Sequence, residues 1–176
     1  MLSELRNRLQ AGKRTSTRQV EPRPTAEPID GGMAWELPAA ESLYETRSQL
    51  NPTDAEWRER LTEEQYYIMR QHGTERPGSC ALLHEKRPGT FSCAGCDTPL
   101  FAASLKFESG TGWPSFNDPI PGSVETTTDR SHGMVRTEVH CATCGSHLGH
   151  VFPDGPPPTG LRYCINGVAL NFTPNE

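Results

Sequence analysis

The sequence predicts a mainly β fold, built from antiparallel β-sheets with two short helices on their N-terminal side. Beyond residue 90, short runs rich in aromatic and β-branched residues alternate with turn residues, which is typical of strands. Glycine and proline number 16 each among 176 residues, so turns are frequent and long helices are few. No strand–helix–strand alternation is visible, which argues against a parallel α/β sheet.

The charge balance restricts the partners that this protein can have. The 17 basic and 22 acidic residues give a formal net charge of −5, which argues against binding nucleic acid or an anionic membrane. No apolar run reaches the length of a membrane span or of the core of a secretory leader. We therefore expect a soluble, cytoplasmic protein that acts as a monomer.

The chain divides into an extension and one domain. Residues 1–52 have sparse, unpatterned apolar residues and several prolines, which is typical of a flexible N-terminal extension. Residues 53–176 are numerous enough to bury one hydrophobic core. We expect this second segment to carry the function.

Two helix starts open the folded domain. The segment Thr53–Glu56 has the spacing of a capping box, and Thr62–Gln65 repeats it. These patterns predict two short helices that together cover about residues 54–72 and lie over one end of the β core. Gly73 is well placed to end the second helix.

The strands are expected in the rest of the chain. The clearest is 134–141, because Val135, Thr137 and Val139 alternate with polar residues and so share one face. The other expected strands are 90–93, 106–108, 124–127, 148–152, 161–165 and 168–172.

Four of the six cysteines form two C-x-x-C pairs, which are Cys93 with Cys96 and Cys141 with Cys144. Four thiolates suit a tetrahedral Zn²⁺ and leave no open position for a substrate. The pattern therefore predicts a zinc-pinned β core with one structural zinc ion per chain. Two thioredoxin-like redox pairs are less consistent with the sequence, since neither pair has a strand–helix–strand context. The sequence leaves open whether the four cysteines bind iron instead of zinc.

The remaining cysteines are Cys80 and Cys164. A lone cysteine in a strand is usually an inert core residue. Arg162 and Asn166, however, lie two residues to either side of Cys164 and so share its face of a strand. A guanidinium lowers the pKa of a nearby thiol, and an amide can bind a substrate, so Cys164 is a candidate nucleophile.

Two histidines, His147 and His150, precede Cys164 and are followed by a Gly/Pro-rich loop, 155–160, that can fold them over it. Extra zinc ligands or surface histidines are the simpler interpretations. Beside a nucleophile, they are better interpreted as proton donors to a leaving oxygen. Asp154 could orient one imidazole or raise its pKa, although Asp-Gly is also a turn sequence.

The segment Gly112–Phe116 holds an indole in a stiff loop, because Trp113 is followed by Pro114. Such a Trp–Phe pair usually belongs to the core. An indole displayed in this way can also form the wall of a small apolar pocket, for instance around a methyl group. We therefore take Trp113 and Phe116 as candidate substrate-binding residues.

Over residues 54–174 the chain resembles the B-type methionine sulfoxide reductases, which act on the R epimer. The segments that carry the resemblance are Trp57–Leu61, Gly73–Glu75, both C-x-x-C pairs, Gly112–Phe116, His147–Asp154 and Arg162–Asn166. The resemblance implies an antiparallel β fold with N-terminal helices and a structural zinc. It also implies that residues 53–176 are a catalytic domain acting on methionine-R-sulfoxide in oxidised proteins or peptides.

The resemblance further implies a role for each site residue. Cys164 would attack the sulfoxide sulfur, and Trp113 would contact the substrate methyl group. Residues that would hold or protonate the oxygen are His147, His150 and Asn166, supported by Arg162 and Asp154. The attack leaves a sulfenic acid, which a second thiol converts to a disulfide for reduction by an external dithiol such as thioredoxin.

Many family members have the second thiol, the resolving cysteine, where this chain has Thr111. Cys80 is the other cysteine that is not assigned to zinc, and some relatives use a cysteine from about this region. We therefore expect Cys80 to be the resolving thiol. Direct reduction of the sulfenic acid by thioredoxin or a small thiol is the alternative.

Two other functions fit parts of the sequence. A non-catalytic zinc-stabilised β module that binds a ligand or peptide would explain the four cysteines and Trp113, but not Cys164 among cationic and imidazole side chains. A hydrolase with a cysteine nucleophile would not explain two spare thiols.

Overall fold

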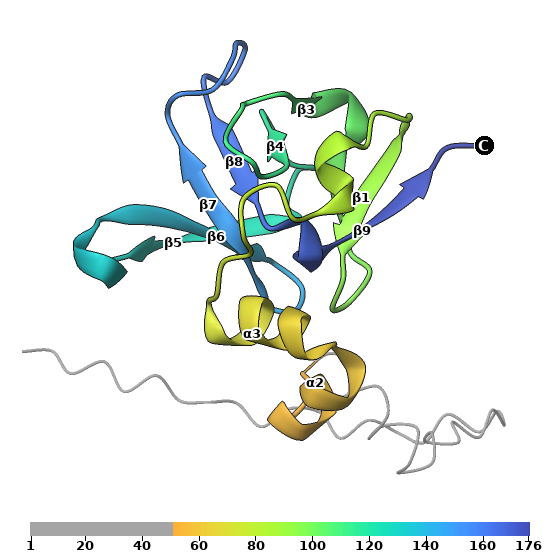
Figure 1. The fold of residues 1–176 in the computed structure, drawn as a ribbon, viewed down its shortest axis with the longest axis vertical. Coiled ribbons are helices and arrows are strands. Elements are labelled where there is room, and N and C mark those ends of the chain that lie inside the picture. The colour runs from red at the N-terminus through yellow and green to blue at the C-terminus, as the bar shows by residue number, and fades with distance from the viewer. Residues whose placement is uncertain (1–50) are drawn as a thin grey trace, which may run out of the picture. The chain divides into compact units, whose positions relative to one another are not determined.

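The computed structural model describes residues 51–176, so the expected extension lies outside the described residues except for its last two positions (Figure 1). Two helices come first, α2 (Asp54–Arg60) and α3 (Glu63–Gln71). No helix in this part of the chain is long and apolar enough to cross a membrane. The strands that follow are β1 (Gly89–Cys93), β2 (Pro99–Ala102), β3 (Lys106–Phe107), β4 (Ser115–Phe116), β5 (Val124–Asp129), β6 (Arg136–Cys141), β7 (His147–Phe152), β8 (Arg162–Ile165) and β9 (Leu170–Pro174).

The strands form two sheets, one with the order β2-β1-β9 and one with the order β3-β4-β8-β7-β6-β5. Every pairing in both sheets is antiparallel. Figure 1 shows β5 and the adjoining part of β6 extending away from the rest of the larger sheet. The mainly β, antiparallel fold class with two short N-terminal helices is therefore confirmed.

Both helices begin where the sequence predicts. Thr53 and Thr62 are the N-caps, and each makes a complete capping box with the residue three positions later. The end of α3 differs in one respect, because the left-handed residue is His72, with φ 56°, rather than Gly73. At Gly73 a Cβ would lie 2.4 Å from the ring of Tyr67, so a side chain there would require the exposed Tyr67 side chain to move.

Most expected strands are present within one or two residues of their predicted bounds. β6 starts only at Arg136, because the preceding residues Met134 and Val135 are 47% and 71% exposed and follow a 3-10 turn. β9 starts at Leu170, because a 3-10 turn occupies Gly167–Ala169. The strands β2 and β4 were not predicted. β4 has only two residues, too few for alternation to show.

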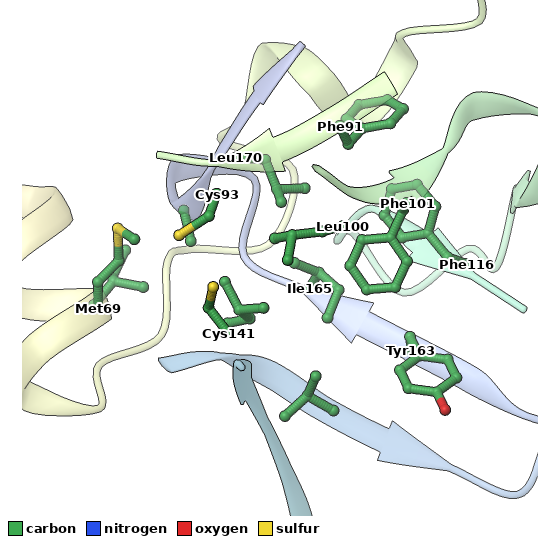
Figure 2. Close-up of a cluster of buried hydrophobic side chains, with 14 of the residues drawn as sticks. Met69, Phe91, Cys93, Leu100, Phe101, Phe116, Cys141, Tyr163, Ile165 and Leu170 are labelled. Carbon is green, nitrogen blue, oxygen red and sulfur yellow. The ribbon is translucent and has the colours of Figure 1, made fainter. Parts of the chain in front are cut away.

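The hydrophobic core lies between the two sheets (Figure 2). Phe91 of β1 packs edge-on against Phe116 of β4, with ring centroids 5.1 Å apart, and Phe101 of β2 stacks on Phe116 at 4.4 Å. Ile165 of β8 and Leu170 of β9 lie in the same cluster. This core holds β8, the strand that carries Cys164, against the smaller sheet.

Candidate active site

A row of four residues crosses the larger sheet at Cys164. In the register of the sheet, Glu138 of β6 lies opposite His150 of β7, His150 lies opposite Cys164 of β8, and Cys164 lies opposite Ser115 of β4. Directly opposite residues of antiparallel strands project from the same face and have Cβ atoms about 5 Å apart. Strand pairing, rather than the loop 155–160, therefore places His150 beside Cys164.

Gly149 explains how closely β7 and β8 approach at this row. A Cβ on Gly149 would lie 2.0 Å from the carbonyl oxygen of Cys164 and 3.0 Å from the Cα of Ile165. Real atoms do not approach so closely, so any side chain at Gly149 must push the two strands apart. The glycine between the two histidines is thus a requirement of the backbone around Cys164.

The Cys164 thiol is partly buried, and burial raises its pKa above the ordinary value. The charge of Arg162 and hydrogen bonds from Thr111 and Arg162 oppose this effect without reversing it. Arg162 thus lowers the pKa of this thiol in the expected direction, but burial outweighs its effect in the resting protein. Arg162 itself is held by two hydrogen bonds to Asp154, of 2.9 and 3.0 Å.

Each histidine is paired with a carboxylate that the sequence analysis did not identify. The Nδ1 atom of His147 lies 2.7 Å from Oε1 of Glu138, and Nε2 of His150 lies 2.8 Å from Oδ2 of Asp129. Asp154 pairs with Arg162 and is not the partner of either imidazole. The prediction that Asp154 orients a histidine is thus corrected, because Asp129 and Glu138 reach the rings from β5 and β6.

The two imidazoles lie against each other, with ring centroids 5.5 Å apart and nearly perpendicular planes. The His147 side chain is only 2% exposed, and burial lowers its pKa while the hydrogen bond with Glu138 opposes that shift. Its Nε2 atom is buried and has no hydrogen-bond partner. A buried polar atom without a hydrogen bond costs free energy unless a ligand or a water molecule supplies the missing partner.

The loop before β4 presents the indole. Trp113 is partly exposed, and its Nε1–H donates to the backbone oxygen of Glu75 at 3.2 Å. Glu75, in turn, accepts from the backbone N–H groups of Gly167 and Val168 at 2.8 and 2.9 Å. Glu75 therefore ties the Trp113 loop to the turn that follows β8, and sequence reasoning did not give it this role.

Two expected substrate contacts have other partners in the structure. The amide of Asn166 donates to the oxygen of Leu148 at 2.9 Å and accepts from the N–H of Glu75 at 3.0 Å. Asn166 therefore fixes the backbone with one of its two N–H groups and with its oxygen, and its contact with a substrate stays a prediction. Phe116 is 0% exposed and stacks on Phe101 in the core, so its ring has no exposed surface in the resting protein.

Cys80 packs against the turn Gly167–Ala169, which follows β8. Its Sγ atom accepts from the N–H of Leu82 at 3.3 Å, and burial raises the pKa of the thiol. A Cβ on Gly167 would lie 2.1 Å from this sulfur, so Cys80 packs against a residue only three positions after Cys164. Both cysteines are free thiols.

The four remaining cysteines converge at one end of the core. The Sγ atoms of all four lie within 4.8 Å of one another. Cys93 and Cys144 have sulfurs 3.7 Å apart, and Cys96 and Cys141 have sulfurs 3.6 Å apart. A tetrahedron of sulfurs around Zn²⁺ with bonds of about 2.3 Å requires separations of roughly 3.8 Å. The four cysteines are thus positioned to bind one metal ion.

A family model and several curated proteins match the part of the chain that contains these residues. The family model described as the SelR domain matches residues 61–174. Peptide methionine sulfoxide reductase MsrB of Agrobacterium fabrum is 57% identical over 130 residues, which are 73% of this chain and 96% of the relative. The protein of that name from Pseudomonas putida is 57% identical over 129 residues, 73% and 97% of the two chains. The one from Leptospira interrogans is 53% identical over 125 residues, 70% and 95% of the two chains.

Proposed function

The chain belongs to the SelR domain family of MsrB-type methionine sulfoxide reductases, and we propose that it is a peptide-methionine (R)-S-oxide reductase. One observation supports this most directly: the register of β7 and β8 sets His150 opposite Cys164 on one face of the sheet. Sulfoxide reduction by a thiol needs a sulfur nucleophile and a proton donor side by side. A binding module needs neither.

The proposed reaction is a two-electron oxygen transfer. The Cys164 thiolate attacks the sulfoxide sulfur and forms a sulfur–sulfur bond, while the oxygen takes up one proton. The sulfur–sulfur bond and the sulfur–oxygen bond of the substrate then break as the hydroxyl oxygen bonds to the Cys164 sulfur. The products are methionine and a sulfenic acid on Cys164, so the substrate is reduced by two electrons and the cysteine is oxidised by two. The charge of Arg162 favours the thiolate that begins the reaction.

Other residues would contact the sulfoxide oxygen and the methyl group of the substrate. We assign His147 and His150 as the groups that hold and protonate the leaving oxygen, with Glu138 and Asp129 fixing the two rings. The unpartnered Nε2 of His147 supports this assignment, because it lacks the hydrogen bond that a substrate oxygen could supply. Trp113, partly exposed and fixed through Glu75, would contact the methyl group.

The epimers of blocked methionine sulfoxide test the activity itself. Zinc-loaded protein with dithiothreitol should reduce the R epimer and leave the S epimer unchanged, and Cys164→Ser should abolish the reaction. Chromatography of the released methionine derivative measures both. If folded, zinc-loaded protein reduces neither epimer, the proposed function is wrong and the ligand-binding module becomes the better interpretation.

We propose that Cys80 is the resolving thiol. The Cys164 sulfenic acid would condense with the Cys80 thiol, forming a disulfide and releasing water, and thioredoxin would then reduce the disulfide. The packing of Cys80 against Gly167 supports this route, because the turn that holds Gly167 continues directly from Cys164.

A Cys80→Ser variant tests the recycling route. After one turnover it should stop at the sulfenic acid, without an intramolecular disulfide, and its thioredoxin-dependent turnover should fall by at least about tenfold. Mass spectrometry and trapping with dimedone distinguish the two oxidation states. Ser79→Ala, at the neighbouring position, should behave as wild type. Turnover of Cys80→Ser at the wild-type rate with thioredoxin would instead support direct reduction of the sulfenic acid.

The metal completes the proposal. We infer that the four cysteines hold one structural Zn²⁺, since four thiolates at the observed sulfur separations match tetrahedral coordination. We also propose that residues 53–176 are the catalytic domain of a monomeric cytoplasmic enzyme, and that its substrates are methionine sulfoxide residues in proteins or peptides. Reduction of an oxidised protein, compared with free methionine sulfoxide, tests the last point.

A further inference from the structure

A second group of metal-ligand side chains includes His147 of the active site and none of the four cysteines. His72 at the end of α3, Glu138 on β6 and His147 on β7 bring their ligand atoms within 4.8 Å of one another. Oε1 of Glu138 lies 2.8 Å from Nδ1 of His72 and 2.7 Å from Nδ1 of His147. One carboxylate oxygen thus lies between two imidazole nitrogens from separate elements of the fold.

The three residues differ in exposure in a way that suits ion entry. The side chains of His72, Glu138 and His147 are 66%, 14% and 2% exposed. The His72 side chain can move, and strands β6 and β7 hold the backbones of Glu138 and His147 in place. A tetrahedral ion with bonds of about 2.0–2.2 Å needs ligand atoms roughly 3.3 Å apart, so each contact must open by about half an ångström. Rotation of the exposed His72 ring opens the contact between His72 and Glu138, and rotation of the Glu138 carboxylate opens the contact with His147.

We infer that His72, Glu138 and His147 form a second divalent-metal site, which takes a late first-row ion such as Zn²⁺ with water as the fourth ligand. Two imidazoles and one carboxylate are a ligand set that zinc uses in proteins, whereas Mg²⁺ and Ca²⁺ prefer oxygen ligands alone.

The ion would inhibit sulfoxide reduction. An imidazole whose Nδ1 is bound to a metal cannot also become an imidazolium, so His147 would lose its ability to deliver a proton to the substrate oxygen. This consequence rests on the proposed function, but the binding of the metal does not. Free zinc would therefore inhibit sulfoxide reduction even when the four cysteines already hold their own zinc ion.

Cobalt(II) is a suitable probe, because its visible absorption reports coordination and its near-ultraviolet absorption reports thiolate ligands. Untagged, reduced protein with zinc already bound to the four cysteines would be titrated with Co²⁺ in the absence of free thiols. We expect one further equivalent to bind with nitrogen and oxygen ligands only, and Zn²⁺ to displace it. Binding should weaken by more than about tenfold in His72→Asn and His72→Gly.

These two variants retain the left-handed backbone of His72, which asparagine and glycine adopt readily. His84→Ala removes another exposed histidine, on the 3-10 helix Ala81–His84, and should bind Co²⁺ as wild type does. Thiolate absorption on adding Co²⁺, no binding, or equal binding by the His72 variants would overturn the inference.

Single-turnover release of methionine from pre-reduced protein separates inhibition from activity. The rate of each protein without added metal is its own reference, because His72 also hydrogen-bonds Glu138. Added Zn²⁺ should slow wild type at the concentrations that fill the second site and leave the His72 variants unaffected. If wild type binds the second ion and reduces no sulfoxide without it, the proposed function fails and the metal site stands. If Zn²⁺ fills the site without slowing the reaction, the inferred inhibition is wrong.

Discussion

At the scale of single residues, the site depends on charge pairs that connect different strands. Glu138 and Asp129 each hold one histidine through a hydrogen bond of 2.7–2.8 Å. Burial would raise the pKa of Glu138, but its hydrogen bonds with His147 and His72 lower it. The carboxylate therefore stays ionised beside the buried His147, where its charge favours the protonated ring.

Glu138→Gln tests this role, because it retains the size of the side chain and removes the charge. Loss of the charge lowers the pKa of His147 further, so the protonated donor is lost at a lower pH as the pH rises. We expect kcat/KM for the R-sulfoxide to fall roughly 10²-fold, the scale of one general acid, and the alkaline decline of the pH–rate profile to shift to lower pH. Glu125→Gln, on exposed β5, is the control. An unshifted profile would show that Glu138 has only a structural role.

At the scale of elements, the pairing of β7 with β8 organises the site. His150 lies opposite Cys164, and the β7–β8 contact is close only because Gly149 lacks a side chain. The turn after β8 is fixed in the same region by Glu75, which accepts two backbone N–H groups. Geometry at the nucleophile thus follows from backbone contacts as much as from the reactive side chains.

Gly149→Ala should separate these two strands. Its Cβ cannot lie 2.0 Å from the carbonyl oxygen of Cys164, so the backbone must shift. We expect a loss of about 1–3 kcal/mol in the free energy of unfolding, typical of overpacking, and a larger loss of kcat than of stability. Urea denaturation and R-sulfoxide kinetics measure the two effects. Thr126→Ala, at an exposed position of β5, should change neither, and wild-type stability in Gly149→Ala would contradict the close approach.

At the scale of the whole molecule, the metal ligands join the two sheets. Cys93 ends β1 of the smaller sheet, and Cys141 ends β6 of the larger one. Their partners Cys96 and Cys144 lie in the turns that follow. An ion bound by all four would hold the ends of both sheets together beside the core of Phe91 and its neighbours.

Removal of the metal should therefore unfold the domain. Structural zinc contributes on the order of 10 kcal/mol in small zinc domains, which is comparable to the net stability of about 5–15 kcal/mol of a typical protein. Chelation, or Cys96→Ser, should abolish the cooperative thermal transition followed by circular dichroism. Cys164→Ser is a matched control and should melt with the wild-type cooperativity. A metal-free protein with an unchanged melting temperature would exclude a structural role for the metal.

The sequence by itself determined the fold class, both capped helices, most strands and the four cysteines, because these depend on local spacing and periodicity. It also singled out Cys164, His147 and His150 as a group. Only the tertiary structure decided which carboxylates meet the histidines, that Asn166 is used by the backbone, and that the pKa of Cys164 is raised. Pairing across strands and burial decide these properties, and both depend on residues far apart in the chain.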